Sequence, residues 1–254
     1  MYFDAHAHLD DEQFATGLED VLAGIESAGV EGVVNAACDV ASIHSSHALA
    51  KSVPYIWCTA GVHPHYAADV TPADYDVVMD YARRDKCVAV GEIGLDYHYD
   101  FSPRDVQRRV FCEQLALAHE LRMPVVLHIR EAYQDANEIL SANRGLLADG
   151  VLLHCYSGSM ELVRDVYNGL DCYYSFGGAV TFAKHKEEVL RAVPRERLLL
   201  ETDCPYMTPV PYRGQRNTPA TIPIICRRVA ELLGADEEEI ARLTTANARR
   251  FYRL

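Results

Sequence analysis

The sequence predicts one α/β domain over residues 1–254, folded as a (β/α)8 TIM barrel. Short β-rich runs alternate with longer amphipathic stretches, an order that implies parallel strands joined by right-handed crossovers. There are eight such runs in 254 residues, which matches the size of this barrel. An open doubly wound sheet is the alternative fold. The first run is not followed by Gly-x-Gly-x-x-Gly, the motif typical of nucleotide-binding proteins in that class.

The expected strands are short runs rich in β-branched, aromatic or other apolar residues. In chain order they are Tyr2–Ala5, Gly32–Ala37, Tyr55–Ala60, Val88–Gly91, Val125–His128, Val151–His154, Cys172–Ser175 and Leu198–Glu201. The expected helices have amphipathic patterns: Leu18–Ala28, Ala73–Arg83, Val106–Leu121, Tyr133–Asn143, Met160–Asn168, Lys186–Ala192, Ile222–Leu233 and Glu237–Ala248. Ser102 and Pro103 predict the start of the third of these helices, with the serine as its cap.

The composition is that of an acidic globular protein with a formal charge of −13. This charge argues against broad, non-specific docking on DNA or on anionic membranes, which normally requires a basic face. It leaves a phosphate-bearing substrate open, because bound cations would dominate the field inside a pocket. No secretory signal and no apolar segment of membrane-spanning length are seen. The eight dispersed cysteines favour reduced thiols in a cytoplasmic protein.

Histidine and carboxylate residues recur where the expected strands end. His6 and His8 are two residues apart, so a strand would turn both rings to the same side. Further candidates follow later strands: His63 and His65, Glu92, His128, His154, and Glu201 with Asp203. In a barrel, these strand ends converge on the carboxyl-terminal face. A single histidine in such a place is more often a hydrogen-bonded rim residue, but the repetition predicts a binuclear metal centre.

Three arginines are placed to receive an anionic substrate: Arg130 after the fifth strand, and Arg213 and Arg216 after the eighth. Ion pairing at the surface is the alternative for each of them, and for Arg216 the two interpretations stay equally open. Lys184 and Lys186 are expected on a solvated helix face. Four histidines lie in helical patterns and receive no role: His44, His47, His119 and His185.

Taken in order, these motifs resemble the TatD family of metal-dependent deoxyribonucleases, within the amidohydrolase-like barrels. The segments that carry the resemblance are 4–9, 61–65, 91–97, 124–128, 153–158, 201–206 and 211–219, which together span the chain. Two departures lie near the expected substrate position: Ile129-Arg130-Glu131, where relatives often carry a small residue and Arg-Asp, and Cys204, where serine or alanine is frequent. Neither is a proposed ligand, so both bear on the substrate rather than on the metal.

The resemblance implies two divalent metal ions. His6, His8 and Asp203 would hold one ion, His128 and His154 the second, and Glu92 would bridge them. Members of this family are described as Mg²⁺-dependent. However, a set rich in imidazoles suits Mn²⁺, Zn²⁺ or Ni²⁺ at least as well as Mg²⁺, so all four remain candidates.

The first functional hypothesis is a 3′→5′ exodeoxyribonuclease acting on single-stranded or frayed DNA ends, as a monomer or dimer without a membrane partner. Glu92 and Asp203 would be catalytic, and Asp203 would orient the attacking water and take its proton. His63, with Arg130 or Arg213, would contact the phosphate. Glu201 is expected among the substrate-binding residues. It would support the site by orienting one of the metal ligands.

A second hypothesis is an esterase or deacylase that uses the same centre, for example on D-aminoacyl-tRNA. A third is a barrel that binds metal or a partner without catalysis. This third hypothesis is disfavoured because all six proposed ligands are present.

Overall fold

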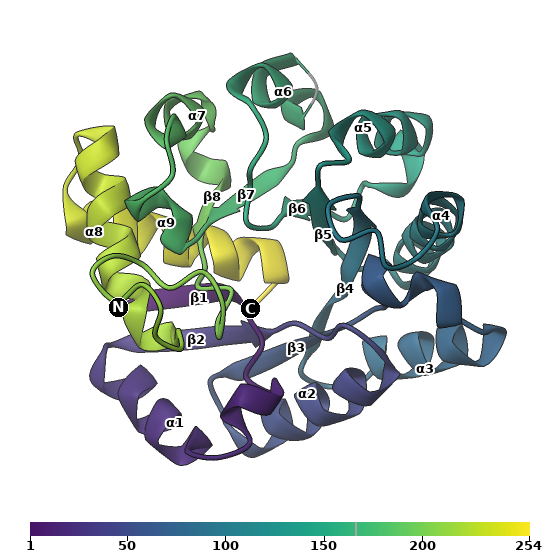
Figure 1. Ribbon diagram of the computed structural model, residues 1–254, viewed down its shortest axis with the longest axis horizontal. Coiled ribbons are helices and arrows are strands. Elements are labelled where there is room, and N and C mark those ends of the chain that lie inside the picture. Colours follow the sequence, from purple (N-terminus) through teal and green to yellow (C-terminus); the bar gives the residue numbers. More distant parts are fainter. Residues whose placement is uncertain (166) are drawn as a thin grey trace.

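The computed structural model describes residues 1–165 and 167–254, and eight parallel strands form one sheet in this part of the chain. The strands are β1 (Tyr2–Ala7), β2 (Val30–Asn35), β3 (Ile56–Ala60), β4 (Cys87–Asp96), β5 (Val125–Arg130), β6 (Val151–Leu153), β7 (Tyr173–Phe176) and β8 (Leu198–Leu200). Each pairs with the next along the sequence. Backbone bonds join the two edges, because Asp203 N donates to His6 O (3.0 Å) and His8 N donates to Cys204 O (2.8 Å). The predicted (β/α)8 barrel is confirmed, with helices α1 to α8 around the strands and α9 across one end (Figure 1).

The helices follow the strands in alternation. They are α1 (Leu18–Ser27), α2 (Val40–Ser52), α3 (Pro72–Ala82), α4 (Arg104–Leu121), α5 (Tyr133–Ala142), α6 (Met160–Asp165), α7 (Lys186–Ala192), α8 (Ile222–Leu233) and α9 (Glu237–Tyr252). Within residues 1–165 and 167–254, no helix combines the length and apolar character needed to cross a membrane. Of the expected helix Met160–Asn168, α6 covers Met160–Asp165, Tyr167 and Asn168 belong to a 3-10 helix, and position 166 lies outside the described residues.

Two details differ from the sequence-based expectations. No bounds were predicted for helix α2, although His44 and His47 were expected in a helical pattern. Its first turn is capped by Asp39, whose carboxylate accepts from Ser42 N at 2.7 Å. The cap predicted at Ser102 is wrong, because α4 begins at Arg104 with Pro103 at the cap position. The Ser102 hydroxyl donates instead to His65 O at 2.9 Å. A bond to a distant segment replaces the local bond that the sequence suggested.

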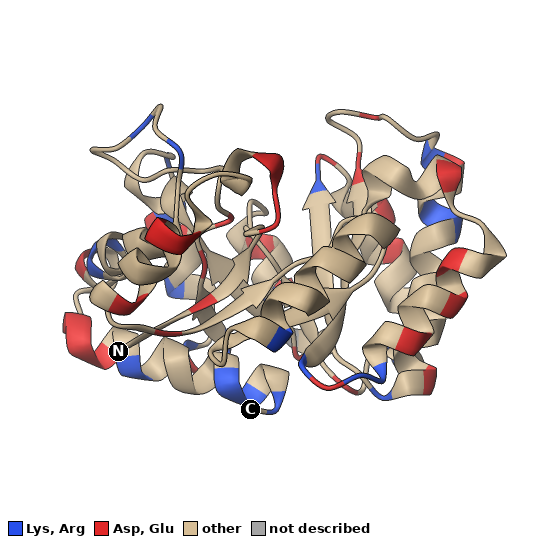
Figure 2. Cartoon of the chain, turned by 90° about the horizontal axis from the view of Figure 1, so that it is seen from below, with Lys and Arg blue, Asp and Glu red and all other residues tan. Residues whose placement is uncertain are grey.

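The barrel interior is filled at the end where the strands begin. Phe3, Val126 and Leu199 from three strands form a buried cluster with Phe251 and Tyr252 of α9. The Tyr252 hydroxyl donates to Ala5 O at 2.7 Å, which fixes α9 across this end. Figure 2 shows both chain termini on this side of the molecule and long loops on the opposite side. Polar side chains at the strands' carboxyl ends can therefore meet only at the opposite mouth.

Candidate metal centre

The six predicted ligands meet at the carboxyl ends of the strands. They come from five places along the chain: His6 in β1 and His8 just beyond it, Glu92 in β4, His128 in β5, His154 directly after β6, and Asp203 after β8. Strands β1 and β4 run further than expected, so His6 and Glu92 lie inside strands rather than at their ends. The three ligands beyond strand ends are also held by backbone bonds to neighbouring segments: His8 N donates to Cys204 O, His154 N to Leu127 O and Asp203 N to His6 O. The positions of the side chains are therefore well defined.

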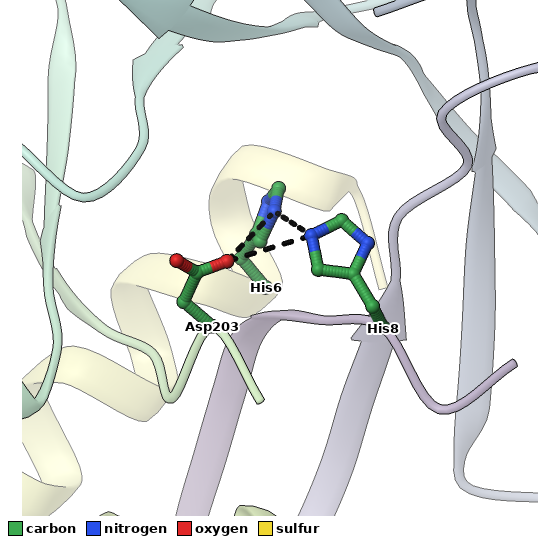
Figure 3. Close-up of side chains that lie close together, drawn as sticks. All are labelled: His6, His8 and Asp203. Atoms are coloured by element: carbon green, nitrogen blue, oxygen red, sulfur yellow. Dashed lines mark hydrogen bonds and ion pairs between the residues drawn. The ribbon is translucent and has the colours of Figure 1, made fainter. Parts of the chain in front are cut away.

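One group consists of His6, His8 and Asp203, whose side chains point toward one another (Figure 3). The Nε2 atoms of His6 and His8 are 3.2 Å apart. Asp203 Oδ1 lies 3.4 Å from His8 Nε2 and 3.8 Å from His6 Nε2. Ligands held about 2.1 Å from one cation lie roughly 3–3.5 Å from each other. This group therefore has the spacing of a metal site with two nitrogen ligands and one oxygen ligand.

A second group consists of His128 and His154, on the other side of Glu92. His128 Nδ1 lies 3.3 Å from His154 Nε2. The His154 ring stacks on His6 with a centroid distance of 4.0 Å, so the two groups are in contact.

Glu92 turns one carboxylate oxygen to each group. Its Oε2 lies 3.2 Å from His6 Nε2, and its Oε1 lies 2.8 Å from both His128 Nδ1 and His154 Nε2. The residue is buried, which by itself opposes ionisation, but the positive charge of surrounding imidazoles such as His154 and His6 holds the pKa of Glu92 well below its usual range. An ionised carboxylate with this orientation is suited to bridging two cations.

Outer partners turn the ring lone pairs inward. A neutral imidazole has one N–H and one lone pair. His8 Nδ1 lies 3.0 Å from Ala36 O, and His128 Nε2 lies 2.9 Å from Asp96 Oδ2, so each of these nitrogens carries the hydrogen. The opposite nitrogen of each ring then presents a lone pair to the centre, which is the arrangement expected of metal-binding histidines.

His63 has the reverse arrangement. Its Nδ1 accepts from His65 N at 3.2 Å, so the neutral ring carries its hydrogen on Nε2. That Nε2 lies 3.6 Å from Glu92 Oε1. Burial, with the charge of His128, lowers the pKa of His63 well below its usual value and keeps the ring neutral. His63 thus directs an N–H donor at the centre, although its distance from Glu92 would also suit a ligand.

The charges around the cluster fit a bound cation. In the described part of the chain, His154 Nδ1 and Glu201 Oε1 have no hydrogen-bond partner, and both lie on the side of His154 that faces away from Glu92. No lysine or arginine there pairs with Glu92 or Asp203. Burial would lower the pKa of His154, but the negative charges of Glu92 and Glu201 raise it well above its usual value, so these two carboxylates favour a positive charge beside them. Divalent ions would supply this charge.

Glu201 lies behind His154 and is fully buried. Its Oε2 accepts from Ser175 Oγ at 2.5 Å, and its Oε1 is 3.7 Å from His154 Nδ1. The residue is thus placed against a candidate ligand rather than in the open mouth of the barrel.

The predicted arginines lie at the mouth and do not contact the candidate ligands. The Arg130 guanidinium carbon is 4.8 Å from the centre of the Tyr99 ring, and that of Arg213 is 4.1 Å from the centre of the Phe182 ring. Arg216 donates to the backbone oxygen of Gln13 and so links two loops.

Lys186 was expected on a solvated helix face, and this expectation is wrong. Its ammonium group is partly buried and donates to Tyr156 O at 2.8 Å.

Sequence reasoning gave no role to Asp96, although it is part of the centre's surroundings. Its Oδ2 lies 2.9 Å from His128 Nε2 and 3.0 Å from His65 Nε2. The available signal was spacing, because residues 92 and 96 are an even number of positions apart in one strand. Cys38 was also not singled out, and its Sγ lies 3.7 Å from His8 Nδ1.

A (β/α)8 barrel with such a cluster of imidazoles and carboxylates at its carboxyl-terminal mouth is a metal-dependent hydrolase. Residues 3–253 match the TatD related DNase family, so the chain belongs to this family, as its motifs predicted.

The relatives match this chain over 98–100% of its length. The chain is 41% identical to the uncharacterized metal-dependent hydrolase YabD of Bacillus subtilis, with 100% of both chains covered. It is 36% identical to the 3′-5′ ssDNA/RNA exonuclease TatD of Salmonella typhimurium, with 98% of both covered. The crystal structure of YJJV, a TatD homologue from Escherichia coli, superposes with a TM-score of 0.93 at 28% identity, covering 100% of this chain and 98% of that one.

Proposed function

We propose that this protein is a 3′→5′ exonuclease that hydrolyses phosphodiester bonds at single-stranded or frayed DNA ends with two divalent metal ions. The observation that carries the proposal is the orientation of Glu92: its Oε2 faces His6, and its Oε1 faces His128 and His154. The relatives named as 3′-5′ ssDNA/RNA exonucleases support this substrate class.

In this proposal, His6, His8 and Asp203 would hold one ion. His128 and His154 would hold the second, and Glu92 would be shared between the two. When bound, such ions make water more acidic and neutralise charge on the phosphate oxygens. The imidazole-rich ligand set suits Mn²⁺, Zn²⁺ or Ni²⁺ at least as well as Mg²⁺.

The protein's own groups would orient the reactants and move the proton. Asp203 lies at the edge of the cluster, where its carboxylate accepts the proton of the attacking water. His63 donates its Nε2 hydrogen to a phosphate oxygen, because its other nitrogen is already an acceptor. Glu201 orients His154 from behind. Arg130 and Arg213 attract the incoming phosphates at the mouth.

The surroundings of the site are consistent with an enzyme that releases its substrate readily. A net charge of −13 predicts weak retention on duplex DNA and poor processivity. All eight cysteines are free, which supports a reducing, cytoplasmic location. A monomer or a dimer would serve equally, because each ligand comes from one chain.

The test uses protein loaded in turn with Mg²⁺, Mn²⁺, Zn²⁺ or Ni²⁺, and three substrates: 3′-labelled single-stranded DNA, an aryl ester and a D-aminoacyl-tRNA. We expect release of labelled mononucleotide that stops with EDTA and in His128→Ala. His119→Ala is the control, because His119 is an exposed residue of α4 away from the centre. If only the ester or the aminoacyl-tRNA is hydrolysed, the protein is an esterase or deacylase and not a nuclease, since the same centre can polarise a carbonyl group.

A further inference from the structure

Exposed aromatic side chains gather at one end of the barrel. In the described part of the chain they all lie in the segments that follow strands β3, β4, β7 and β8: Tyr66, Tyr99, Phe101, Phe182, Tyr206 and Tyr212. This is the end that carries the candidate metal centre. Because exposed apolar surface is unfavourable in water, its concentration on one face indicates a binding surface.

The most exposed of these rings belongs to Phe101, with 67% of its surface accessible. It stacks on Tyr99 with a centroid distance of 5.3 Å and an interplanar angle of 24°. The Phe101 ring is 4.8 Å from that of His65, which in turn is 4.2 Å from His63 and 6.2 Å from His128. A continuous series of rings thus leads from the candidate ligands to the exposed face of Phe101.

Buried side chains hold this loop in place. Asp96 Oδ1 accepts from Tyr99 N at 2.8 Å, and Ser102 Oγ donates to His65 O at 2.9 Å. The Gln107 amide donates to the backbone oxygens of both Asp96 (3.1 Å) and Ser102 (2.8 Å) and so ties the two ends of the loop together. The aromatic pair is therefore presented to solvent by a fixed backbone, which reduces the entropy lost when a ligand binds.

A cation accompanies the aromatic pair. The Arg130 guanidinium carbon lies 4.8 Å from the centre of the Tyr99 ring. Arg130 is exposed and forms no ion pair in the described part of the chain, whereas the neighbouring carboxylates Asp100 and Glu131 pair with Arg104 and His98. The combination matches a nucleotide, whose base stacks on aromatic rings and whose phosphate pairs with arginine.

We propose that Phe101, supported by Tyr99, stacks on a base of single-stranded nucleic acid, and that Arg130 contacts an adjacent phosphate. The inference deepens the proposed exonuclease function and rests on it for the choice of substrate. Stacking of this kind accepts every base, so it holds the strand at the mouth without reading its sequence. It also favours single strands, because bases inside a duplex are already stacked on their neighbours.

The test measures binding directly, by fluorescence anisotropy of a labelled short oligothymidylate. Its linkages are phosphorothioates that resist cleavage, and the protein is loaded with metal. We expect Phe101→Ala to raise the Kd about tenfold, while Phe101→Trp binds at least as tightly as the unaltered protein. The side chain is exposed, so both variants should keep the melting temperature of the unaltered protein.

An oligomer of the same length without bases separates stacking from charge. The unaltered protein should bind it more weakly than oligothymidylate, and Phe101→Ala should bind it as the unaltered protein does. Equal Kd values for Phe101→Ala and the unaltered protein on oligothymidylate overturn the inference, as does the absence of any binding, which would leave the surface to a protein partner. Binding that depends on Phe101 without release of mononucleotides from normal DNA would retain this inference and reject the exonuclease. Release of mononucleotides from normal DNA together with binding that does not depend on Phe101 would retain the exonuclease and reject this inference.

Discussion

Asp96 Oδ2 lies 2.9 Å from Nε2 of His128 and so fixes the ring with its other nitrogen, Nδ1, toward Glu92. The same oxygen accepts from His65 Nε2 at 3.0 Å. Burial opposes the ionisation of Asp96, but the hydrogen bonds from both histidines hold its pKa below its usual range. One buried carboxylate therefore orients a candidate metal ligand and a ring that contacts Phe101.

Replacement of Asp96 by asparagine reverses the polarity at one of its two oxygens. The amide keeps an acceptor for Tyr99 N but presents an NH₂ group to His128, which then loses its acceptor. We expect metal affinity at one of two sites to fall about 10- to 100-fold. Titration calorimetry with metal-free protein measures this change. The control is Asp80→Asn, which alters an exposed pair with Arg84 on α3, and equal affinities in both variants would contradict the role of Asp96.

Substitutions of His63 and His128 distinguish a donor from a ligand. We expect His63→Ala to keep its full metal content while kcat falls roughly 10²- to 10³-fold, the usual cost of losing one donor to a developing negative charge. His63→Gln should recover part of that loss, because its amide also donates. His128→Gln should lose one equivalent of metal. Elemental analysis after dialysis, together with kcat, separates these outcomes, and loss of metal from His63→Ala would show that His63 is a ligand.

Removal of metal should lower the thermal stability of the protein. Glu92 and Asp203 contact histidines but no lysine or arginine in the described chain, so ions bound to the folded state stabilise it by mass action. At 100 times the Kd, one ion contributes about 2.7 kcal/mol. For a chain of this size, that corresponds to a rise in Tm of roughly 5–10 °C. Calorimetry with and without chelator measures the rise, and Glu92→Gln should reduce it. An equal Tm with and without chelator would argue against metal binding at this cluster.

Most of the barrel could be predicted because alternating strands and helices leave few alternative arrangements. The bounds of helix α2 could not be predicted, because Val40–Ser52 is rich in alanine, serine and histidine and lacks a clear apolar stripe. Its buried positions include Ser46 and Ala50 as well as Ile43. The sequence predicts Ser102 as a cap because caps are recognised from local sequence. Its actual partner, His65 O, is brought to it only by the fold.

The convergence of the candidate ligands could also be predicted, since the topology brings the strand ends together. The sequence could not predict which of the two nitrogens in each ring is hydrogen-bonded to an outer partner. That assignment depends on tertiary partners such as Ala36 O for His8 and His65 N for His63. The exposure of Phe101 was equally hidden, because it results from bonds made by Gln107 within the folded loop.

Gly94 supports the last prediction, because it lies in β4 directly opposite His128 in β5. Its φ is +141°, and a Cβ atom there would lie 2.0 Å from His128 O. Gly94→Ala must therefore strain the backbone and push the two strands apart at a candidate ligand. We expect the free energy of unfolding to fall by about 3–5 kcal/mol, with a loss of bound metal.

Urea unfolding of the metal-free protein isolates the structural part of this effect, and metal titration measures the rest. Gly145→Ala is the matched control, because a Cβ at Gly145 meets nothing within 4 Å, and its unfolding free energy should stay within about 0.5 kcal/mol of the unaltered value. If Gly94→Ala were equally harmless, the strands would be free to separate at His128. The backbone could then not be what holds this ring against Glu92, and the geometry of the centre would depend on the bound ions instead.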